Sequence, residues 1–320
     1  MNRRRGTAVA IALLGAALAA AGCGLGPGAD VGPVELTVTR DFGTQPVLRS
    51  SFEAKESDTV MRALESEADV ETRFGGGFVH SIDGVTEGER GGDPYDWFFF
   101  VDGVESPIGA ADVDLKEGER VWWDYRDWSA TNHVPAVVGS WPAPFSDGVA
   151  GKSHPVVVEC ADATRGSFRT DTDRKEPEVG WAAACVAARQ AVEREGATLS
   201  SESSKGAIRM LVGPWDRLRQ DPAAQLLEDG PAESGIYADF KGADLVALGE
   251  SGAEARDLGP DAGLVAATSR YGGPPVWLVT GGTAAAVREA AAALNAAHLR
   301  DHYAMAIEGG QETPLPVAGR

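Results

Sequence analysis

The run Trp97–Glu105 (WFFFVDGVE) constrains the fold of this chain more than any other segment. Two apolar stretches flank the pair Asp102-Gly103, and an Asp-Gly pair in that position is typical of a type I′ turn between antiparallel strands. Successive side chains of a strand point to opposite faces, so Trp97 and Phe99 share one face and the phenylalanines beside them share the other. The run therefore predicts a β-hairpin that carries aromatic side chains on both faces.

The segments around this hairpin predict further strands and one early helix. Ser57 or Asp58 is placed to cap a short helix over Thr59–Glu65, and Gly-rich or acidic turns separate the other segments. Further strands are predicted at Val34–Thr39, Phe78–Ile82 and Arg120–Tyr125. Residues 34–130 are therefore expected to form a β-grasp-like domain with one helix.

The same segments carry a family pattern. A W-x-aromatic-x-V-[ND]-G hairpin, an acidic-Gly turn and a W-x-Y strand follow one another in this order. They are formed by Trp97, Phe99, Val101, Asp102, Gly103, Gly118, Trp123 and Tyr125. This part of the chain resembles the transcobalamin-like C-terminal domain family, the small β-domain of cobalamin carriers and of exported bacterial modules. Asp102 stands where the family usually has Asn, and no segment here resembles the helical barrel of those carriers.

The resemblance implies that this domain covers one face of a corrinoid or of another flat, partly apolar ligand. Its predicted ligand-binding residues are Gly76, Phe78, Trp97, Phe99, Trp123, Tyr125 and Trp128. The alternative is that these rings form a core against the rest of the chain. A corrinoid would be a ligand and not a cofactor, so no cofactor and no metal site are predicted. His80 and His133 could ligate cobalt, but a lone histidine more often has a structural role.

The N-terminus is predicted to be a lipoprotein signal peptide covering residues 1–22. Arg3, Arg4 and Arg5 precede an apolar run of about 15 residues, which is shorter than the about 20 that a membrane span needs. Small residues directly before Cys23 resemble a bacterial lipobox, with Ala20 where leucine is usual. Cys23 is therefore expected to be acylated, for example with palmitate. Ordinary secretory cleavage before an incidental cysteine is the alternative.

Acylation of Cys23 would anchor the protein in the cell membrane on the extracytoplasmic side. Residues 23–33 are rich in Gly and Pro and are predicted to tether the folded part to the lipid bilayer. The chain has 29 Lys and Arg against 48 Asp and Glu, a net charge of −19. Such an acidic surface repels phosphate backbones, which excludes nucleic acid as a partner.

Residues 134–320 differ in composition from the preceding part. They are rich in alanine, and their pattern predicts strands that alternate with helices. Helices are predicted over Trp181–Arg194, Trp215–Leu227 and Thr283–His298. The pattern predicts an α/β domain of unknown function with two βαβ-like halves. The fold class of the whole chain is therefore α+β followed by α/β.

Cys160 and Cys185 are expected to form a disulfide. Export places them in an oxidising compartment, and 24 residues lie between them. Cys160 ends an apolar strand, and Cys185 lies on the apolar stripe of the predicted helix Trp181–Arg194. No third cysteine accompanies them to favour a metal or redox role.

Catalytic motifs are missing from the sequence. Gly151-Lys152-Ser153 lacks the upstream glycine of a phosphate loop, and no G-x-S-x-G nucleophile elbow occurs. Gly281-Gly282-Thr283 could hold an anion but is more typical of a tight turn, and His298 with His302 lacks an obvious third metal ligand.

These features together predict a non-enzymatic binding protein that carries a small molecule and serves a membrane importer. The first alternative is a structural or adhesive module of the cell envelope that binds protein or glycan. The second is an exported hydrolase whose site lies in the α/β part.

Overall fold

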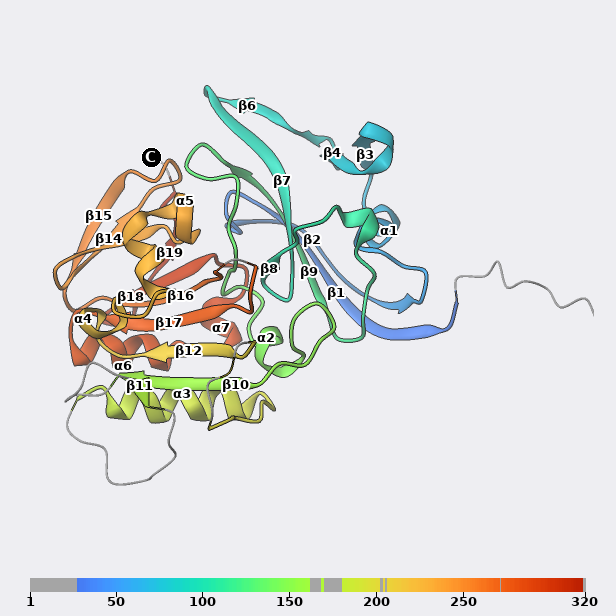
Figure 1. The fold of residues 1–320 in the computed structure, drawn as a ribbon. Helices are drawn as coiled ribbons and strands as arrows, with labels where there is room; N and C mark the ends of the chain where they lie inside the picture. Colours follow the sequence, from blue (N-terminus) through green and yellow to red (C-terminus); the bar gives the residue numbers. More distant parts are fainter. Residues whose placement is uncertain are drawn as a thin grey trace, which may run out of the picture.

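The computed structural model describes residues 28–161, 168–169, 180–201, 204, 206–270 and 272–318. Their fold is mixed α/β, with a mixed sheet and one helix at the N-terminal side and a second mixed sheet with helices at the C-terminal side (Figure 1). Cys23 and the predicted signal peptide lie outside the described residues. No helix of the described ranges has the length and hydrophobicity needed to cross a membrane.

The first sheet has the strand order β2-β1-β9-β7-β6, with β8 paired to β7. Its strands are β1 (Asp30–Arg40), β2 (Gln45–Lys55), β6 (Gly88–Arg90), β7 (Asp93–Val101), β8 (Val104–Glu105) and β9 (Arg120–Asp127). β1 and β9 run parallel at the centre, and their other neighbours are antiparallel. Because β1 begins at Asp30, the end of the segment predicted as a tether belongs to this sheet.

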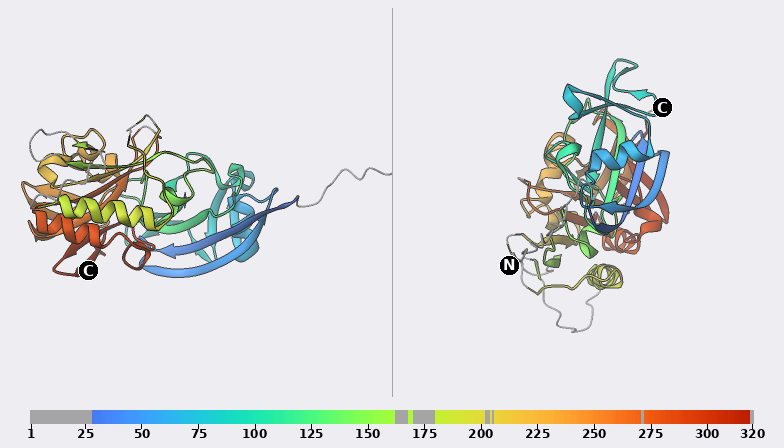
Figure 2. Two further views of the ribbon diagram at one scale, coloured as in Figure 1. Left: turned by 90° about the horizontal axis from the view of Figure 1, so that it is seen from below. Right: turned by 90° about the vertical axis from the view of Figure 1, so that its right-hand side faces the viewer.

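Helix α1 (Val60–Glu67) packs across one face of the first sheet, as the right-hand view of Figure 2 shows. Its buried side chains, Val60, Met61 and Leu64 among them, share a core with the inward side chains of β1, β7 and β9. The N-cap is Thr59, whose hydroxyl accepts from the Arg62 N–H, and not Ser57 or Asp58 as the sequence suggested. This arrangement confirms the predicted β-grasp-like architecture.

The predicted hairpin turn is present between β7 and β8. Asp102 and Gly103 have φ of 51° and 78°, the left-handed values that a type I′ turn requires at both central positions. A Cβ on Gly103 would lie 2.9 Å from the Val137 carbonyl oxygen, so only glycine fits there. Trp97 stands opposite Tyr125, and Phe99 opposite Trp123, on the same face of the sheet.

A small antiparallel sheet lies beside the first one. Its strands are β3 (Val70–Arg73), β4 (Phe78–Ile82) and β5 (Val85–Thr86). The short 3₁₀ helix η1 (Phe74–Gly76) joins β3 to β4, and η2 (Ala110–Asp112) follows β8. The Trp97 indole N–H donates to the Val85 carbonyl at 3.0 Å and ties the small sheet to β7.

The second sheet has the order β11-β10-β12-β17-β16-β18-β19. Its strands are β10 (Val156–Ala161), β11 (Phe168–Arg169), β12 (Ile208–Val212), β16 (Gly263–Thr268), β17 (Val276–Gly281), β18 (Ala304–Glu308) and β19 (Gln311–Leu315). β10, β12 and β17 are parallel, and the remaining strands pair antiparallel. Parallel neighbours need long crossovers, which the intervening helices supply.

The two faces of the second sheet have different covers. Helices α3 (Ala182–Arg194), α6 (Ala284–Ala292) and α7 (Ala296–Leu299) pack on one face, as does α2 (Ala143–Ser146). The other face is covered by α4 (Trp215–Leu218), η3 (Ala224–Asp229), α5 (Pro231–Ser234) and the antiparallel sheet β13 (Ala238–Lys241), β14 (Asp244–Leu248) and β15 (Glu254–Gly259).

Two predicted helices are wrong in length. The helix expected over Trp215–Leu227 stops at Leu218, because Pro222 has no N–H to continue the ladder and its ring clashes with the preceding turn. The helix expected over Thr283–His298 is split into α6 and α7. The side chain of Asn295 accepts the N–H groups that begin α7, so the chain starts a new helix there.

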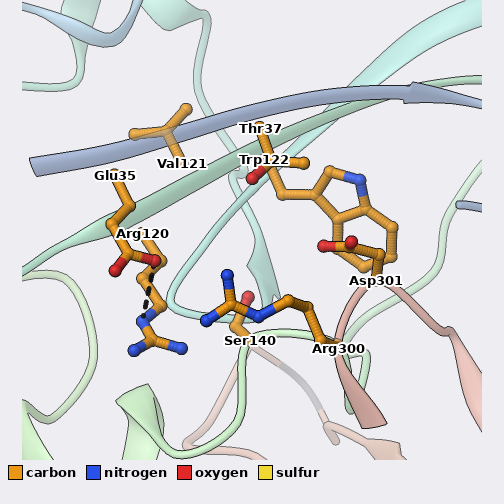
Figure 3. Close-up of a pocket in the computed structure, with 9 residues that line it drawn as sticks. Glu35, Thr37, Arg120, Val121, Trp122, Ser140, Arg300 and Asp301 are labelled. Carbon is orange, nitrogen blue, oxygen red and sulfur yellow. Dashed lines mark ion pairs between the residues drawn. The ribbon is translucent and has the colours of Figure 1, made fainter. Parts of the chain in front are cut away.

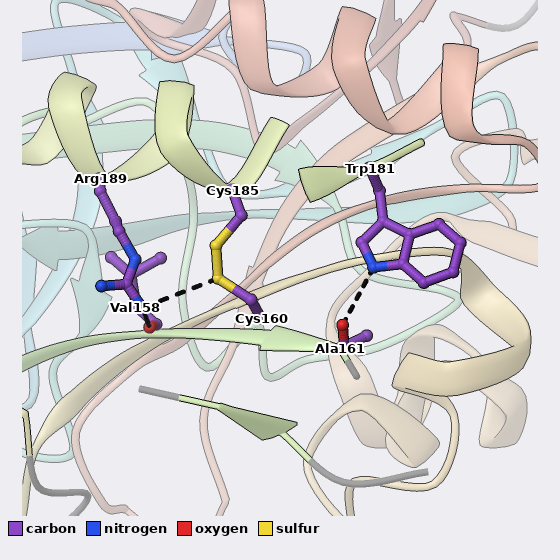
Figure 4. The surroundings of a disulfide bond; sticks show 6 residues. All are labelled: Val158, Cys160, Ala161, Trp181, Cys185 and Arg189. Carbon is purple, nitrogen blue, oxygen red and sulfur yellow. Dashed lines mark hydrogen bonds between the residues drawn. A yellow bond between two sulfur atoms is a disulfide. The ribbon is translucent and has the colours of Figure 1, made fainter. Parts of the chain in front are cut away.

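The predicted disulfide joins Cys160 on β10 to Cys185 on α3, with a Cα–Cα distance of 6.0 Å (Figure 4). The Trp181 indole N–H donates to the Ala161 carbonyl at 3.0 Å and holds the start of α3 on the same strand. A cross-link that closes a loop of this size stabilises the folded state by about 3 kcal/mol in the chain-entropy picture. Helix α3 is therefore fixed to the edge of the parallel sheet at two points.

The second face of the first sheet packs against the second sheet, and the two parts lie side by side in the left-hand view of Figure 2. Phe100 and Trp122 contact the Tyr303 ring edge-on, with centroids 5.6 and 5.4 Å away. Asp124 is fully buried and accepts from Thr39 Oγ1 at 2.6 Å and from the Tyr303 hydroxyl at 3.0 Å. Burial raises the pKa of this Asp124 carboxyl.

Candidate functional site

A hollow of about 190 Å³ opens beside strand β7 on the side of the first sheet away from the second. β6 pairs with Asp93–Tyr95 and β8 with Phe100–Val101, so within the described chain no strand pairs with residues 96–99 on that edge of β7. β4 and the loop after β8 enclose the gap. The hollow is lined by Met61, Gly77, Phe78, Val79, Asp96, Trp97, Phe98, Phe99, Glu105, Ser106, Gly109, Ala110 and Trp123.

Aromatic side chains form part of the wall of the hollow. Phe99 stacks on Trp123 with centroids 4.8 Å apart, and Trp97 lies beside them on the same face of the sheet. The Trp123 side chain is buried, yet its Nε1–H has no hydrogen-bond partner among the described residues. Buried N–H donors are nearly always satisfied in native proteins, so an acceptor for this indole would come from a water molecule or from a group bound in the hollow.

Among the described residues, the charged side chains that line the hollow are the carboxylates of Asp96 and Glu105. Asp96 Oδ1 accepts the Trp97 N–H at 2.7 Å, and burial raises the pKa of the Asp96 carboxyl to about 6. Glu105 Oε2 accepts the Val134 N–H and lies 3.0 Å from His133 Nδ1. The hydrogen bond to Glu105 raises the pKa of His133, whose ring is largely exposed.

The mouth of the hollow carries exposed apolar side chains. Phe74 is 88% exposed and Ile108 is 53% exposed, and both belong to segments that reach the hollow. The Phe74 ring lies 6.3 Å from the Phe78 ring, edge-on. Gly109 comes close to Gly77, where an added Cβ would lie 3.3 Å from the Gly77 carbonyl oxygen. Exposed apolar side chains grouped at the rim of a pocket are typical of a binding surface.

The structure brings together Phe78, Trp97, Phe99 and Trp123 of the predicted ligand-binding residues. Gly76 lies next to the lining residue Gly77 but does not itself line the hollow. Tyr125 packs between Tyr95 and Trp97, and its hydroxyl donates to the Thr86 carbonyl at 2.9 Å. Trp128 lies beyond the end of β9 and is partly exposed.

Asp96, Glu105 and the exposed Phe74 and Ile108 were not among the predicted site residues. Asp96 directly precedes the aromatic run of β7, and Glu105 ends the predicted hairpin, so both flank the motif that carried the resemblance. A polar residue beside an aromatic strand was the available signal. Ile108 comes to the rim through the loop after β8, which no local pattern predicts.

Two of the histidines considered in the sequence pair with carboxylates that do not line the hollow. His80 pairs with Glu87 at 3.1 Å, and His298 forms an ion pair with Glu312 on β19. Across the described ranges no group of three or more His, Cys, Asp and Glu side chains is arranged to hold a metal ion. Thr283 caps α6 by accepting the Ala286 N–H. This agrees with the interpretation of Gly281-Gly282-Thr283 as a tight turn before a helix.

A second, much smaller hollow of about 20 Å³ lies between the two large sheets (Figure 3). Arg120 and Arg300 point into it near the Ser140 hydroxyl, and Arg120 Nε lies 3.6 Å from Glu35 Oε2. Opposite charges therefore share this space, which is large enough for about one water molecule. It belongs to the junction of the sheets.

Comparison with known proteins assigns part of the chain. Residues 57–127 match the model of a family described as Domain of unknown function (DUF4430), which is a transcobalamin-like domain family. This range contains α1, the small sheet, the β7–β8 hairpin and β9, and so every residue that lines the hollow. The rest of the chain is unassigned. No curated protein matches the chain.

The chain is also similar to a crystal structure from Ruminococcus gnavus ATCC 29149, described there as a proposed metal-binding protein. The TM-score is 0.24 with 20% identity, over 30% of this chain and 97% of that chain.

Proposed function

We propose that this protein is a non-enzymatic, lipid-anchored extracytoplasmic binding protein that captures a small, partly apolar molecule in the hollow beside β7 and serves a membrane importer. The hollow itself carries the proposal. It combines stacked aromatic rings, a buried indole N–H without a partner and an exposed apolar rim, all inside the DUF4430 domain. Apolar walls with few polar groups are characteristic of small-molecule sites.

The size of the hollow limits what it can enclose. Drug-sized ligands occupy pockets of about 300–1,000 Å³, and this hollow offers about 190 Å³. It can take a ring or a side group and leave the remainder of the ligand on the rim formed by Phe74, Phe78 and Ile108. A corrinoid, the ligand class implied by the family resemblance, would bind with one edge inserted and the macrocycle outside.

Tryptophan fluorescence tests this proposal with cyanocobalamin and cobinamide as probes. We expect each probe to quench the fluorescence of the tryptophans in the hollow in a saturable way. Phe78→Ala is expected to weaken the affinity about tenfold, because it removes a ring from the wall and the rim. Val47→Ala is the control, because both side chains are 37% exposed and Val47 lies on β2, at the other edge of the sheet. Lack of saturation up to about 100 μM, a binding free energy near −5.5 kcal/mol, would leave the corrinoid without support.

Anchoring through Cys23 is tested separately. Labelled palmitate is expected to enter the wild-type protein, and Cys23→Ala is expected to abolish labelling and release the protein from the membrane fraction. One acyl-bearing residue is then the only link to the bilayer, so its loss has an all-or-none effect. Cys23→Ala protein that stays in the membrane fraction without label would contradict this anchor.

A further inference from the structure

We propose that the hollow beside β7 selects ligands that carry a cationic group next to an apolar ring, such as an arylalkyl ammonium. This inference rests on the proposed function and names the chemical class of its ligand. The lining combines aromatic rings with carboxylates, and none of the described residues that form it is Lys, Arg or His.

The aromatic wall favours a cation. Trp97, Phe99 and Trp123 share one face of the sheet, and the electron-rich faces of such rings attract ammonium groups, tryptophan most strongly. The attraction grows when the cation loses water, as it would inside a hollow closed by β4 and the loop after β8. A neutral ligand of the same shape makes the same apolar contacts but lacks the attraction between a cation and the ring faces.

Asp96 supplies the negative charge. It forms no ion pair with any described residue, and its hydrogen bond to the Trp97 N–H fixes the carboxylate at the edge of β7. The residue opposite Asp96 on β9 is Arg126, whose Nη1 donates to the carbonyls of Asp127 and Thr131. Arg126 makes no hydrogen bond or ion pair with Asp96 within the described residues, although its charge lowers the pKa of the Asp96 carboxyl.

Glu105 is the second carboxylate, and it is partly committed. Its Oε2 meets the Val134 N–H and the His133 ring. Protonated His133 offsets the charge of Glu105, so Asp96 is the main determinant of charge selection. The whole chain, with a net charge of −19, also favours the approach of cations over anions.

The test compares three ligands of nearly one shape: phenethylammonium, 2-phenylethanol and phenylacetate, with charges of plus one, zero and minus one. Binding to the mature protein is measured by calorimetry at pH 7.5. We expect the ammonium to bind about tenfold more tightly than the alcohol, and the carboxylate to bind most weakly. Equal or tighter binding of the alcohol or the carboxylate overturns the inference.

Variants locate the effect. Asp96→Asn is expected to bring the ammonium close to the alcohol, whereas Asp93→Asn, an exposed carboxylate on the same strand, leaves the difference unchanged. An equal loss in both variants would mean that only the overall charge acts, and would also overturn the inference.

The pH dependence gives a second readout. Desolvation and Glu87 raise the pKa of Asp96 to about 6, against the opposing effects of the Trp97 N–H, Arg126 and His80. Protonation of Asp96 removes the attraction, so the affinity for the ammonium is expected to fall as pH drops from 7.5 to 5, and this fall is expected to vanish in Asp96→Asn. The hydrogen bond to Glu105 raises the pKa of His133, and a fall that persists in Asp96→Asn would assign the charge selection to these two residues and overturn the role of Asp96.

The two proposals fail in different ways. Tight binding of 2-phenylethanol with no preference for the ammonium overturns the cation inference and leaves the binding function intact. Absence of saturable binding for all three ligands and for both corrinoids contradicts both.

Discussion

Replacing Arg209 by leucine is expected to lower the free energy of unfolding by about 3–5 kcal/mol. Arg209 on β12 has Nη2 at 2.6 Å from Glu159 Oε2 and at 2.6 Å from Asp221 Oδ2, and both carboxylates are buried. Leucine would leave two negative charges inside the protein without a counter-ion. Removing one partner of a buried ion cluster costs far more free energy than the intact cluster contributes to stability. Urea denaturation followed by far-UV circular dichroism measures the loss.

Two comparisons make this prediction specific. Arg73→Leu removes an ion pair of the same 2.6 Å length to Glu87, but the Arg73 side chain is 51% exposed, so the expected loss is about 0–1 kcal/mol. Adding Glu159→Gln and Asp221→Asn to Arg209→Leu removes the uncompensated charges and is expected to restore part of the stability. Equal losses in Arg73→Leu and Arg209→Leu would show that burial of the cluster does not matter.

Gly43→Ala is expected to destabilise the junction between the two large sheets by about 3 kcal/mol or more. Gly43 lies in the turn between β1 and β2 with φ of 82°, and an added Cβ would lie 1.7 Å from the Asp301 carbonyl oxygen. The turn would have to move away. Movement would also break the bond from the Gly43 N–H to Asp124 Oδ1, at 3.1 Å, and leave a buried carboxylate with fewer donors.

Gly84→Ala is the matched control for this substitution. Gly84 has φ of 78°, but nothing lies within 4 Å of an added Cβ. It therefore carries the backbone strain of an alanine in the left-handed region, about 1–2 kcal/mol, without the steric conflict. Equal changes in the urea midpoint of the two variants would contradict the close approach of the β1–β2 turn to Asp301.

Elements that depend mainly on neighbouring residues could be predicted from the sequence. The Asp102-Gly103 turn follows from the φ values that only such pairs adopt readily, and the buried stripe of α3 follows from helical spacing. The Cys160–Cys185 pairing needed only one strand, one helix and an oxidising compartment. Pro222 was also a local signal, but the helix predicted over Trp215–Leu227 did not take it into account.

Features that depend on tertiary contacts were beyond the sequence. The alternation along β7 predicted two aromatic faces, but not that Phe100 and Trp122 would meet Tyr303, which lies far along the chain, while Phe99 and Trp123 line a hollow. The hollow exists because β6 and β8 each pair with only one end of β7. No periodicity encodes where a partner strand stops, so the polar character of Asp96 and Glu105 beside the aromatic strand did not place them at a hollow.

The binding role of the hollow is the central claim, and the indole N–H signals of the protein test it most directly. In ¹H–¹⁵N spectra of the mature protein, titration with cobinamide, phenethylammonium or 2-phenylethanol to about 10 mM detects even millimolar binding, near −4 kcal/mol. We predict a saturable shift of the Trp123 indole signal, with a smaller one for Trp97, for at least one of these probes. The signals of Trp215 and Trp277, buried in the cores of the second sheet, are predicted to stay fixed. An unmoved Trp123 signal with every probe, or shifts confined to Trp215 and Trp277, would contradict a ligand site beside β7.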